Sequence, residues 1–226
     1  MAGTGGIAQR WRELSGENNW EGLLDPLDID LRRYIIHYGA RTAAVGDPYN
    51  GDKGSNMSRF FRYPPNNFFS ELGTYLQNPP GWGTYVAVAT DEGKTVLGRR
   101  DILICWRGTW TDLGDIFGDN PHRDAKVHMG FHSIYTAKSP SSRARSPSSK
   151  YNKTSAIEQV LISEVWKLVD KYKDEEISIT VTGHSLGAAL ATMTGVDIAS
   201  NGYNKPSTNN KEGKACPLSS HSHGIC

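Results

Sequence analysis

The feature that most restricts how this chain can fold is a serine flanked by glycines, between a predicted strand and a predicted helix. Residues 177–182 are rich in Ile, Val and Thr, and residues 188–200 are rich in Ala and other small or helix-favouring residues. These patterns predict a strand and then a helix. The pentapeptide that joins them, residues 183–187, reads Gly-His-Ser-Leu-Gly. So short a connection is a sharp turn, and the order of elements predicts an α/β fold.

Gly-x-Ser-x-Gly at such a turn is typical of a nucleophilic serine. The turn strains the serine backbone, and only glycine fits two residues to either side. The following helix points its N-terminus at the serine, so the backbone N–H of Leu186 is expected to donate to an oxyanion. The bare pattern also arises by chance, but its position favours Ser185 as the nucleophile. His184 is expected to pack beside the turn and not to act as the base.

Other segments predict further elements. Residues 102–106 form a continuous apolar run, typical of a strand buried on both faces of a parallel sheet. Residues 84–90 predict a strand that continues through a turn at 91–93 into a short second strand beginning at Val96-Leu97, as in a hairpin. A helix is predicted to begin at Asp25-Pro26, with Leu27, Leu31, Tyr34, Ile35 and Tyr38 on its apolar face.

The remaining chain divides into one more helix and two irregular stretches. Ser155 and Glu158 form a capping-box pattern ahead of an amphipathic helix that extends to Val169. Residues 47–83, dense in Gly, Pro, Asn and aromatics, predict an irregular surface layer, and residues 137–153 predict a polar loop.

Composition narrows the possible partners. The net charge of the 226 residues is +1, so there is no strong basic field to attract nucleic acid, and any lipid contact must be local and apolar. No apolar run reaches the length of a transmembrane helix. Three widely spaced cysteines argue against a disulfide framework, and the first residues lack a signal-peptide pattern, so a cytoplasmic location is expected. No histidine or cysteine cluster has metal-ligand spacing, and no cofactor is expected.

Several segments together resemble one family, the class 3 lipases, and within it the plant cytosolic phospholipases A1. The resemblance is carried by residues 11–16, 19–28, 104–109, 127–131, 133–136 and 182–190. It implies an α/β-hydrolase fold with a mainly parallel central sheet. It also implies hydrolysis of the sn-1 acyl ester of a phospholipid, or of another glycerolipid, at a lipid surface.

The resemblance also assigns a role to Thr109. Thr109 would supply the second oxyanion donor, through its backbone N–H and its hydroxyl. The alternative for Thr109 is a solvent-facing residue in a strand-ending turn. Arg107 is expected to be a structural ion-pair partner.

A triad also needs a histidine and a carboxylate, and these are not apparent after Ser185. Asp197 lies twelve residues along the helix, about 18 Å from the turn, and is expected to be a solvated helix residue. His221 and His223 lie in a polar tail. We therefore expect residues 1–216 to be the N-terminal portion of one lipase domain without its C-terminal strands, and residues 217–226 to be a disordered tail outside the family.

Two consequences follow from that expectation. The strand at 177–182 would be an exposed apolar edge, which invites self-association. The chain would also have an alternative function, that of a catalytically silent fragment that binds lipid or a full-length relative. A triacylglycerol or galactolipid lipase, or a short-chain esterase, on the same scaffold is a further alternative.

Overall fold

The computed structural model describes six segments of the chain: 6–47, 75–81, 83–108, 129–136, 164–206 and 218–223, of which 75–81, 129 and 218–223 are described by their backbone alone. The helices are α1 (Ile7–Leu14), α2 (Ile29–Ala44), α3 (Asp91–Leu97), α4 (Met129–Thr136), α6 (Trp166–Lys171) and α7 (Leu186–Asn201). The strands are β1 (Tyr75–Gly81), β2 (Thr84–Ala89), β3 (Arg100–Trp106), β4 (Ile177–His184) and β5 (Leu218–His223).

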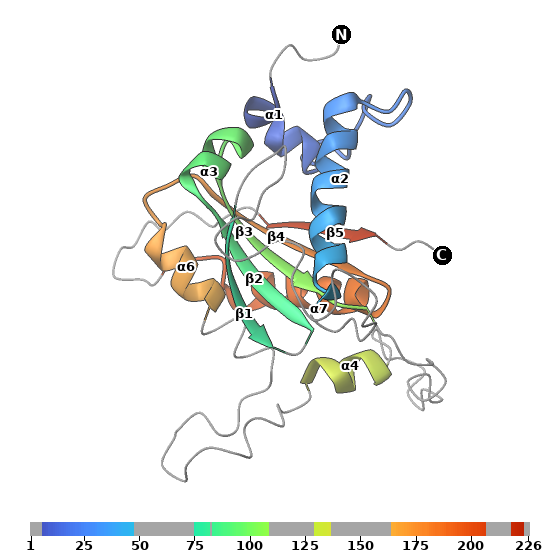
Figure 1. Ribbon diagram of the computed structural model, residues 1–226, viewed down its shortest axis with the longest axis vertical. Helices are drawn as coiled ribbons and strands as arrows, with labels where there is room; N and C mark the ends of the chain where they lie inside the picture. Colours follow the sequence, from blue (N-terminus) through green and yellow to red (C-terminus); the bar gives the residue numbers. More distant parts are fainter. Residues whose placement is uncertain are drawn as a thin grey trace.

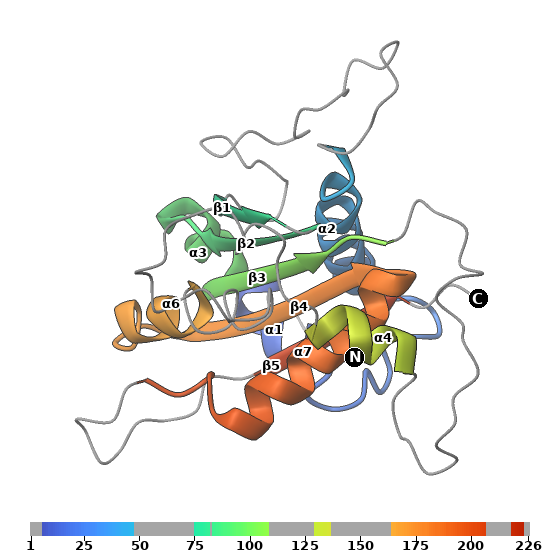
Figure 2. The same ribbon diagram turned by 90° about the horizontal axis from the view of Figure 1, so that it is seen from below.

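The strands form one sheet in the order β1-β2-β3-β4-β5 (Figures 1 and 2). The pairs β1–β2 and β2–β3 are antiparallel, whereas β3–β4 and β4–β5 are parallel. The predicted α/β fold is confirmed, but the prediction of a mainly parallel sheet is wrong because the sheet is mixed. Only residues 90–99 connect β2 to β3, which is shorter than the crossover that a parallel pair requires.

Helices cover both faces of the sheet (Figure 1). Alternate residues of β3 point to opposite faces, as the two-residue period of a strand requires. Leu103 and Cys105 pack with α1, α2 and α3, whereas Ile102 and Ile104 pack with α4, α6 and α7. The sheet therefore separates two apolar cores, and all seven residues of β3 are buried, as the apolar run predicted.

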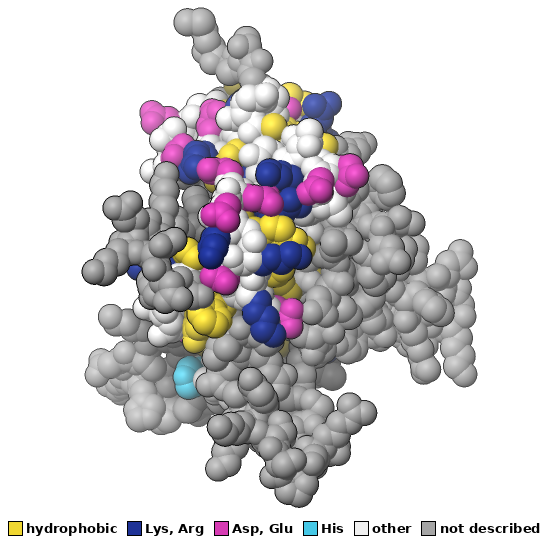
Figure 3. Space-filling model, turned by 90° about the vertical axis from the view of Figure 1, so that its left-hand side faces the viewer, with side chains coloured by type: hydrophobic (Ala, Val, Ile, Leu, Met, Phe, Trp, Pro, Cys, Tyr) yellow, Lys and Arg dark blue, Asp and Glu magenta, His cyan; other side chains and the backbone are white. Residues whose placement is uncertain are grey.

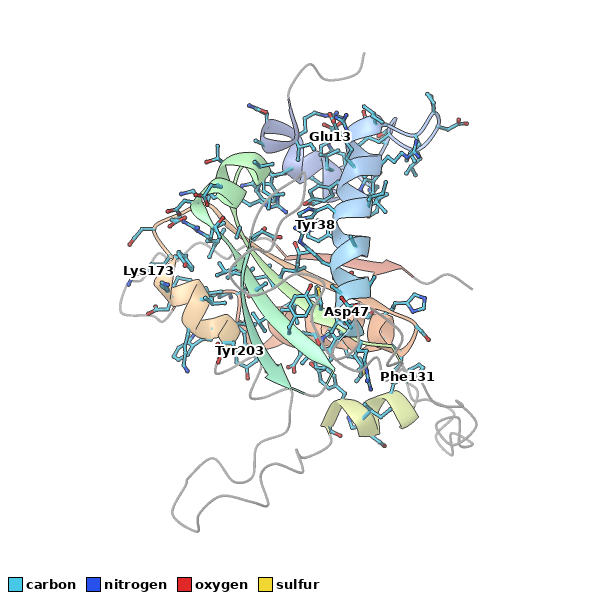
Figure 4. The ribbon with its side chains drawn as sticks, viewed as in Figure 1. Glu13, Tyr38, Asp47, Phe131, Lys173 and Tyr203 are labelled. Atoms are coloured by element: carbon cyan, nitrogen blue, oxygen red, sulfur yellow. The ribbon has the colours of Figure 1, made fainter. Side chains whose placement is uncertain are left out.

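A buried polar network ties α2 to the start of β3 and β4. Asp101 accepts hydrogen bonds from Tyr38 (2.9 Å), Ser178 (2.9 Å) and Thr180 (2.8 Å). Arg99 lies beside it, with its Nη2 at 3.7 Å from the Asp101 carboxylate, and both side chains are fully buried. Figure 4 shows Tyr38 projecting from α2 toward the sheet. The network fixes α2 against the sheet at the end opposite Ser185.

The region after β2 forms a helix, so the predicted hairpin is wrong. Thr90 caps α3, since its hydroxyl accepts a hydrogen bond from the N–H of Gly93 (3.2 Å). The acidic residues Asp91 and Glu92, interpreted above as a turn, form the first turn of the helix, where negative charge is favourable. Leu97, predicted to begin a strand, is buried at the end of α3.

The helix predicted from Asp25-Pro26 begins three residues later. Asp28 is its N-cap, and its carboxylate accepts from the N–H groups of Asp30 (2.8 Å) and Leu31 (3.0 Å). The predicted apolar face is confirmed at Leu31, Tyr34 and Tyr38, which are buried, and Ile35 is partly buried. Leu27 lies before the helix and is 49% exposed, so its assignment to that face is wrong.

The stretches predicted to be irregular are described only in part. Residues 75–81 form strand β1, so irregular structure is the wrong prediction there, whereas 48–74 lie outside the described residues. The polar loop at 137–153 and the capping box at 155–158 also lie outside them. The end of the helix predicted to reach Val169 is confirmed by α6.

The tail is also partly ordered. Residues 218–223 form β5, which pairs with β4 from Ile179 to His184. The prediction of a disordered tail is therefore wrong for these residues, and so is the prediction that 177–182 is an exposed edge, because β4 has a neighbour on each side. The polar residues of β5 can form a strand because an edge strand pairs through its backbone with one neighbour, here β4. Self-association stays a prediction, and β1 and β5 are the outer strands of the sheet that the structure describes.

Among the residues that the structure describes, no helix combines the length and the apolar character that crossing a membrane requires.

Candidate active site

Ser185 lies in the tight turn between β4 and α7 and has a backbone that a serine seldom adopts. Its φ is 54° and its ψ is −126°, outside the regions favoured by residues with a Cβ. Such conformations cost about 1–3 kcal/mol and persist where surrounding structure fixes them. The side chain is exposed. The predicted order of strand, strained turn and helix is confirmed, and the hydroxyl group lies within reach of a substrate.

The two glycines of the pentapeptide are required by close contact. A Cβ added at Gly183 would lie 2.1 Å from the carbonyl oxygen of Gly187. A Cβ added at Gly187 would lie 2.4 Å from the carbonyl oxygen of Trp106, at the end of β3. Both obstacles are backbone atoms, which move only if the turn itself changes shape. The steric reason predicted for these glycines therefore agrees with the structure.

The N-terminus of α7 starts directly at Ser185. The Ser185 carbonyl accepts a hydrogen bond from the N–H of Ala188 (2.8 Å), which closes the first turn. The first N–H groups of a helix lack acceptors within the helix and carry its positive dipole end. Leu186 supplies the first of these, and its buried side chain fixes this end of the 16-residue helix in the core.

The end of β3 comes next to the serine. A Cβ added at Gly108 would lie 2.9 Å from the carbonyl oxygen of His184 and 3.5 Å from the Cβ of Ser185. Sequence reasoning did not single out Gly108, although its place two residues after a buried strand could have indicated it. Thr109 follows immediately but lies outside the described residues.

Arg107, the residue before Gly108, contacts Gly83, the residue before β2. Its backbone N–H donates to the carbonyl of Gly83 (2.6 Å), and its side chain covers Gly83. The ion pair expected for Arg107 stays a prediction.

Hydrogen bonds from α2 support the strand that carries the serine. Thr42 of α2 and Thr182 of β4 share a buried hydrogen bond of 2.8 Å between their hydroxyl groups. Thr182 is three residues before Ser185, so this bond fixes β4 close to the turn. Tyr85 of β2 donates to the carbonyl of Arg41 (2.9 Å) on the same helix. No sequence pattern indicates these contacts, because they join segments that are far apart in the chain.

Two other residues named from the sequence lie near the turn and on α7. His184 is exposed, and its Nδ1 would lie 3.5 Å from a Cβ added at Gly108, so its ring lies beside the turn as expected. Asp197 is half-buried and accepts a hydrogen bond from Tyr135 of α4 (2.9 Å), so it is not simply a solvated residue. Burial and the neighbouring carboxylate of Asp197 raise the pKa of Tyr135. The Tyr135–Asp197 pair links α4 to α7.

Cys105, among the described residues, carries another nucleophilic group close to this edge. It is fully buried on β3, in register with Thr182. Burial raises the pKa of its thiol to about 12. The thiolate is the reactive form of cysteine, so Cys105 is inert in the folded protein. Among the described residues, no group of three or more His, Cys, Asp and Glu could hold a metal ion.

Comparison with known proteins gives a family assignment. A family model described as lipase (class 3) matches residues 104–217, which is 114 of the 226 residues. Phospholipase A1-II 6 of Oryza sativa subsp. japonica is 42% identical, over 94% of this chain and 61% of that protein. Phospholipase A1-IIgamma of Arabidopsis thaliana is 38% identical, over 94% of this chain and 59% of that protein. The chain thus spans about three fifths of the length of these relatives.

Solved structures of lipases are also similar. One is described as a triacylglycerol lipase whose catalytic centre is a serine protease triad, with a TM-score of 0.40, 17% identity and coverage of 74% of this chain and 56% of that one. Another is a lipase from Rhizopus microsporus var. chinensis, with a TM-score of 0.41, 18% identity and coverage of 84% and 57%. The family model, which covers half of the chain and includes the strand, turn and helix around Ser185, carries the assignment: this chain belongs to the class 3 lipase family.

Proposed function

We propose that this chain is a serine acyl hydrolase that releases the sn-1 acyl chain of phospholipids at a lipid surface. Ser185 is the nucleophile, and the backbone N–H groups of Leu186 and Thr109 are the oxyanion donors. The observation that carries the proposal is the positive φ of Ser185 between β4 and α7. A strained, exposed serine at a helix N-terminus is the arrangement that acyl transfer requires.

The reaction follows from that arrangement. A base takes the hydroxyl proton of Ser185 while its Oγ bonds to the ester carbonyl carbon, and the carbonyl electron pair moves to the oxygen. The N–H of Leu186 donates to this oxyanion at the positive end of α7. When the oxyanion collapses, the glycerol oxygen leaves with the proton, and water then releases the fatty acid by the same steps. Removing one oxyanion donor costs about 10²–10³ in rate in enzymes of this chemistry.

The substrate class rests on the two relatives described above, both of which are named as phospholipases A1. A triacylglycerol, a galactolipid and a short-chain ester are the other candidates, and a panel of all four distinguishes them. Preferential release of the sn-1 acyl chain from phosphatidylcholine supports the proposal. Preferential release from triacylglycerol would replace the substrate but keep the nucleophile.

The experiment compares the purified chain with Ser185→Ala and Ser200→Ala on mixed phospholipid vesicles, with fatty acid release measured by mass spectrometry. Ser200 is exposed on the last turn of α7, about 22 Å from Ser185 along the helix, so its variant is the matched control. We expect release by wild type and Ser200→Ala and none by Ser185→Ala. A folded wild type that releases no more than Ser185→Ala would indicate a silent lipid-binding fragment.

We also propose a cytoplasmic location. The support is that Cys105 is a free thiol, as a reducing compartment allows. Cell fractionation with an antibody against the chain tests this, and recovery in a secreted fraction would contradict it.

A further inference from the structure

The face of β4 that packs toward α2 is made of hydroxyl side chains. Ser178, Thr180 and Thr182 lie on this face and are at most 1% exposed. The alternate residues of β4 are apolar and pack on the opposite face, in the core with α7. Buried hydroxyl groups cost free energy unless they are hydrogen-bonded, and apolar side chains fill such space without that cost. The buried hydroxyl face of β4 therefore indicates that its hydrogen bonds have a use beyond burial.

All three hydroxyl groups are hydrogen-bonded to side chains outside β4. Ser178 (2.9 Å) and Thr180 (2.8 Å) donate to Asp101 on β3. Thr182 shares a hydrogen bond with Thr42 of α2 (2.8 Å). Each residue advances about 3.3 Å along a strand, so Thr182 lies about 10 Å before Ser185, and Thr180 about 16 Å before it. The bond to α2 is therefore the one nearest the turn.

The last turn of α2 fixes the direction of that bond. The Thr42 hydroxyl donates to the carbonyl of Tyr38, one turn earlier in the helix (2.9 Å). Because a hydroxyl group has a single hydrogen to donate, Thr182 is the donor to Thr42. The same turn of α2 is also bound to β2, since Tyr85 donates to the carbonyl of Arg41 (2.9 Å). Thr42 thus offers Thr182 an acceptor whose position is already set.

The chain between Thr182 and Ser185 has little space in which to absorb a displacement. A Cβ added at Gly183 would lie 2.1 Å from the carbonyl oxygen of Gly187, so the backbone there is in close contact across the turn. A shift of Thr182 would consequently reach Ser185. The backbone of Ser185 has a positive φ, and such a conformation persists only where the surrounding structure fixes it.

We propose that Thr42 is a positioning residue for the nucleophile. Its hydroxyl accepts from Thr182, holds the end of β4 against α2, and thereby keeps Ser185 in its strained conformation. Thr42 acts through Thr182 and does not touch substrate. The effect on catalysis rests on the proposed function, whereas the effect on the turn does not. A fully hydrogen-bonded buried network has the rigidity that this role requires.

Kinetics of fatty acid release test the role in catalysis. Thr42→Val and Thr182→Val keep the branched side chain but remove one hydroxyl each. We expect kcat to fall at least about 10-fold with KM unchanged, since a misplacement of about 1 Å costs about 100-fold. Thr180→Val, which is the same change on the same face of β4, is the matched control and should keep the wild-type kcat.

Two further variants separate the shared bond from packing. Thr42→Ser retains the hydroxyl and loses only a methyl group, so it should keep the wild-type kcat. The double variant Thr42→Val with Thr182→Val should lose no more than either single variant, because both remove the same bond. If Thr182→Val does not fold, Thr42→Val and Thr42→Ser, which leave β4 intact, carry the test.

Amide hydrogen exchange tests the turn without substrate. The N–H of Ala188 donates to the Ser185 carbonyl (2.8 Å), so its exchange reports on the turn itself. Mass spectrometry with fragmentation to single residues should show exchange about 5-fold faster in Thr42→Val and Thr182→Val, as the loss of one hydrogen bond allows. Thr180→Val should leave the exchange of Ala188 unchanged.

The outcomes distinguish this proposal from the proposed function. Lower kcat, unchanged KM and faster exchange in Thr42→Val and Thr182→Val alone support the positioning role. Wild-type kcat or wild-type exchange in folded Thr42→Val overturns it and keeps Ser185 as nucleophile, as does an equal loss in Thr180→Val. Folded wild type that releases no fatty acid overturns the proposed function. Faster exchange in the two variants would then keep the positioning of the turn, and equal exchange in all variants would overturn that too.

Discussion

Gly183 and Gly187 approach each other so closely across the turn that a Cβ on Gly183 would meet the Gly187 carbonyl oxygen at 2.1 Å. The two glycines flank Ser185, so their contact sets the curvature of the turn and, with it, the positive φ of the serine. Since Gly187 also lies against the carbonyl of Trp106, the end of β3, the end of β4 and the start of α7 form one close-packed unit.

The first prediction follows from this contact. Gly183→Ala should destabilise the protein by about 1–3 kcal/mol, the range for overpacking, and should abolish fatty acid release because the turn must open. Gly39→Ala is the matched control, since a Cβ added at Gly39 in α2 meets nothing within 4 Å. Removing a glycine from a helix should stabilise it by about 0.5–1 kcal/mol. Urea unfolding measures both changes in stability. A Gly183→Ala variant that is as stable as wild type and still releases fatty acid would contradict the steric argument.

The turn around Ser185 could be predicted because its determinants are local. A strand, a helix and two glycines at fixed spacing specify it within a few residues. The identity of β3 was equally local, since an uninterrupted apolar run needs no distant partner to be recognised. What surrounds the turn depends on distant segments. The Thr42–Thr182 bond and the proximity of Gly108 to Ser185 join residues far apart in the sequence.

The errors have physical reasons of the same kind. Asp91-Glu92-Gly93 fits both a turn and the first turn of a helix, and the Thr90 cap, which the sequence does not single out, decides for the helix. Strand β5 has no apolar pattern, and only pairing with β4 makes it a strand. Arg99 and Asp101 look like surface residues until Tyr38, Ser178 and Thr180 are brought around them.

The second prediction concerns the buried carboxylate of Asp101. Asp101→Asn keeps the size of the side chain but removes the negative charge beside the fully buried Arg99. The substitution also replaces one carboxylate oxygen, which accepts hydrogen bonds from hydroxyl groups, with an amide NH₂ group, which can only donate. Breaking a buried pair by removing one partner costs about 3–5 kcal/mol, and we expect a loss of that size in urea unfolding.

The control for Asp101 is an ion pair on the surface. Asp91 pairs with Arg100 at 2.6 Å, but its side chain is 90% exposed. Asp91→Asn should therefore cost less than about 1 kcal/mol. If the two variants lost the same stability, burial would not be what makes Asp101 important.

The third prediction concerns pH and Glu175. On the side of the molecule where α3 and α6 lie, basic and acidic side chains are interleaved (Figure 3). Glu175 accepts two hydrogen bonds from Arg100 (2.9 and 3.1 Å). It also forms an ion pair with Lys94 (2.9 Å). The Arg100 hydrogen bond outweighs desolvation and holds the pKa of Glu175 below its ordinary value. The ionised carboxylate is therefore favoured in the folded state.

A pKa that is lower in the folded state stabilises the protein above the unfolded pKa, and this stability is lost as the pH falls through the folded pKa. The excess stability of wild type over Glu175→Gln should therefore be full at neutral pH and shrink below about pH 4.3, the unperturbed value for glutamate. Urea unfolding at several pH values measures it. Glu176→Gln, whose exposed side chain pairs with exposed Arg12, should cost less at neutral pH. If the stability of wild type relative to Glu175→Gln increased as the pH fell, the result would contradict a lowered pKa of Glu175.

The fourth prediction concerns the thiol of Cys105. Burial raises its pKa to about 12 and closes it to solvent, so iodoacetamide should alkylate it only when the protein opens. Alkylation of the Cys105 peptide, followed by mass spectrometry, should then track the unfolded fraction as urea increases. Asp101→Asn supplies the control, because a loss of about 3 kcal/mol raises the unfolded population, and thus the rate, by about 100-fold. Rapid alkylation of Cys105 in the folded wild type would mean that the core between α2 and β3 admits solvent, which its packing contradicts.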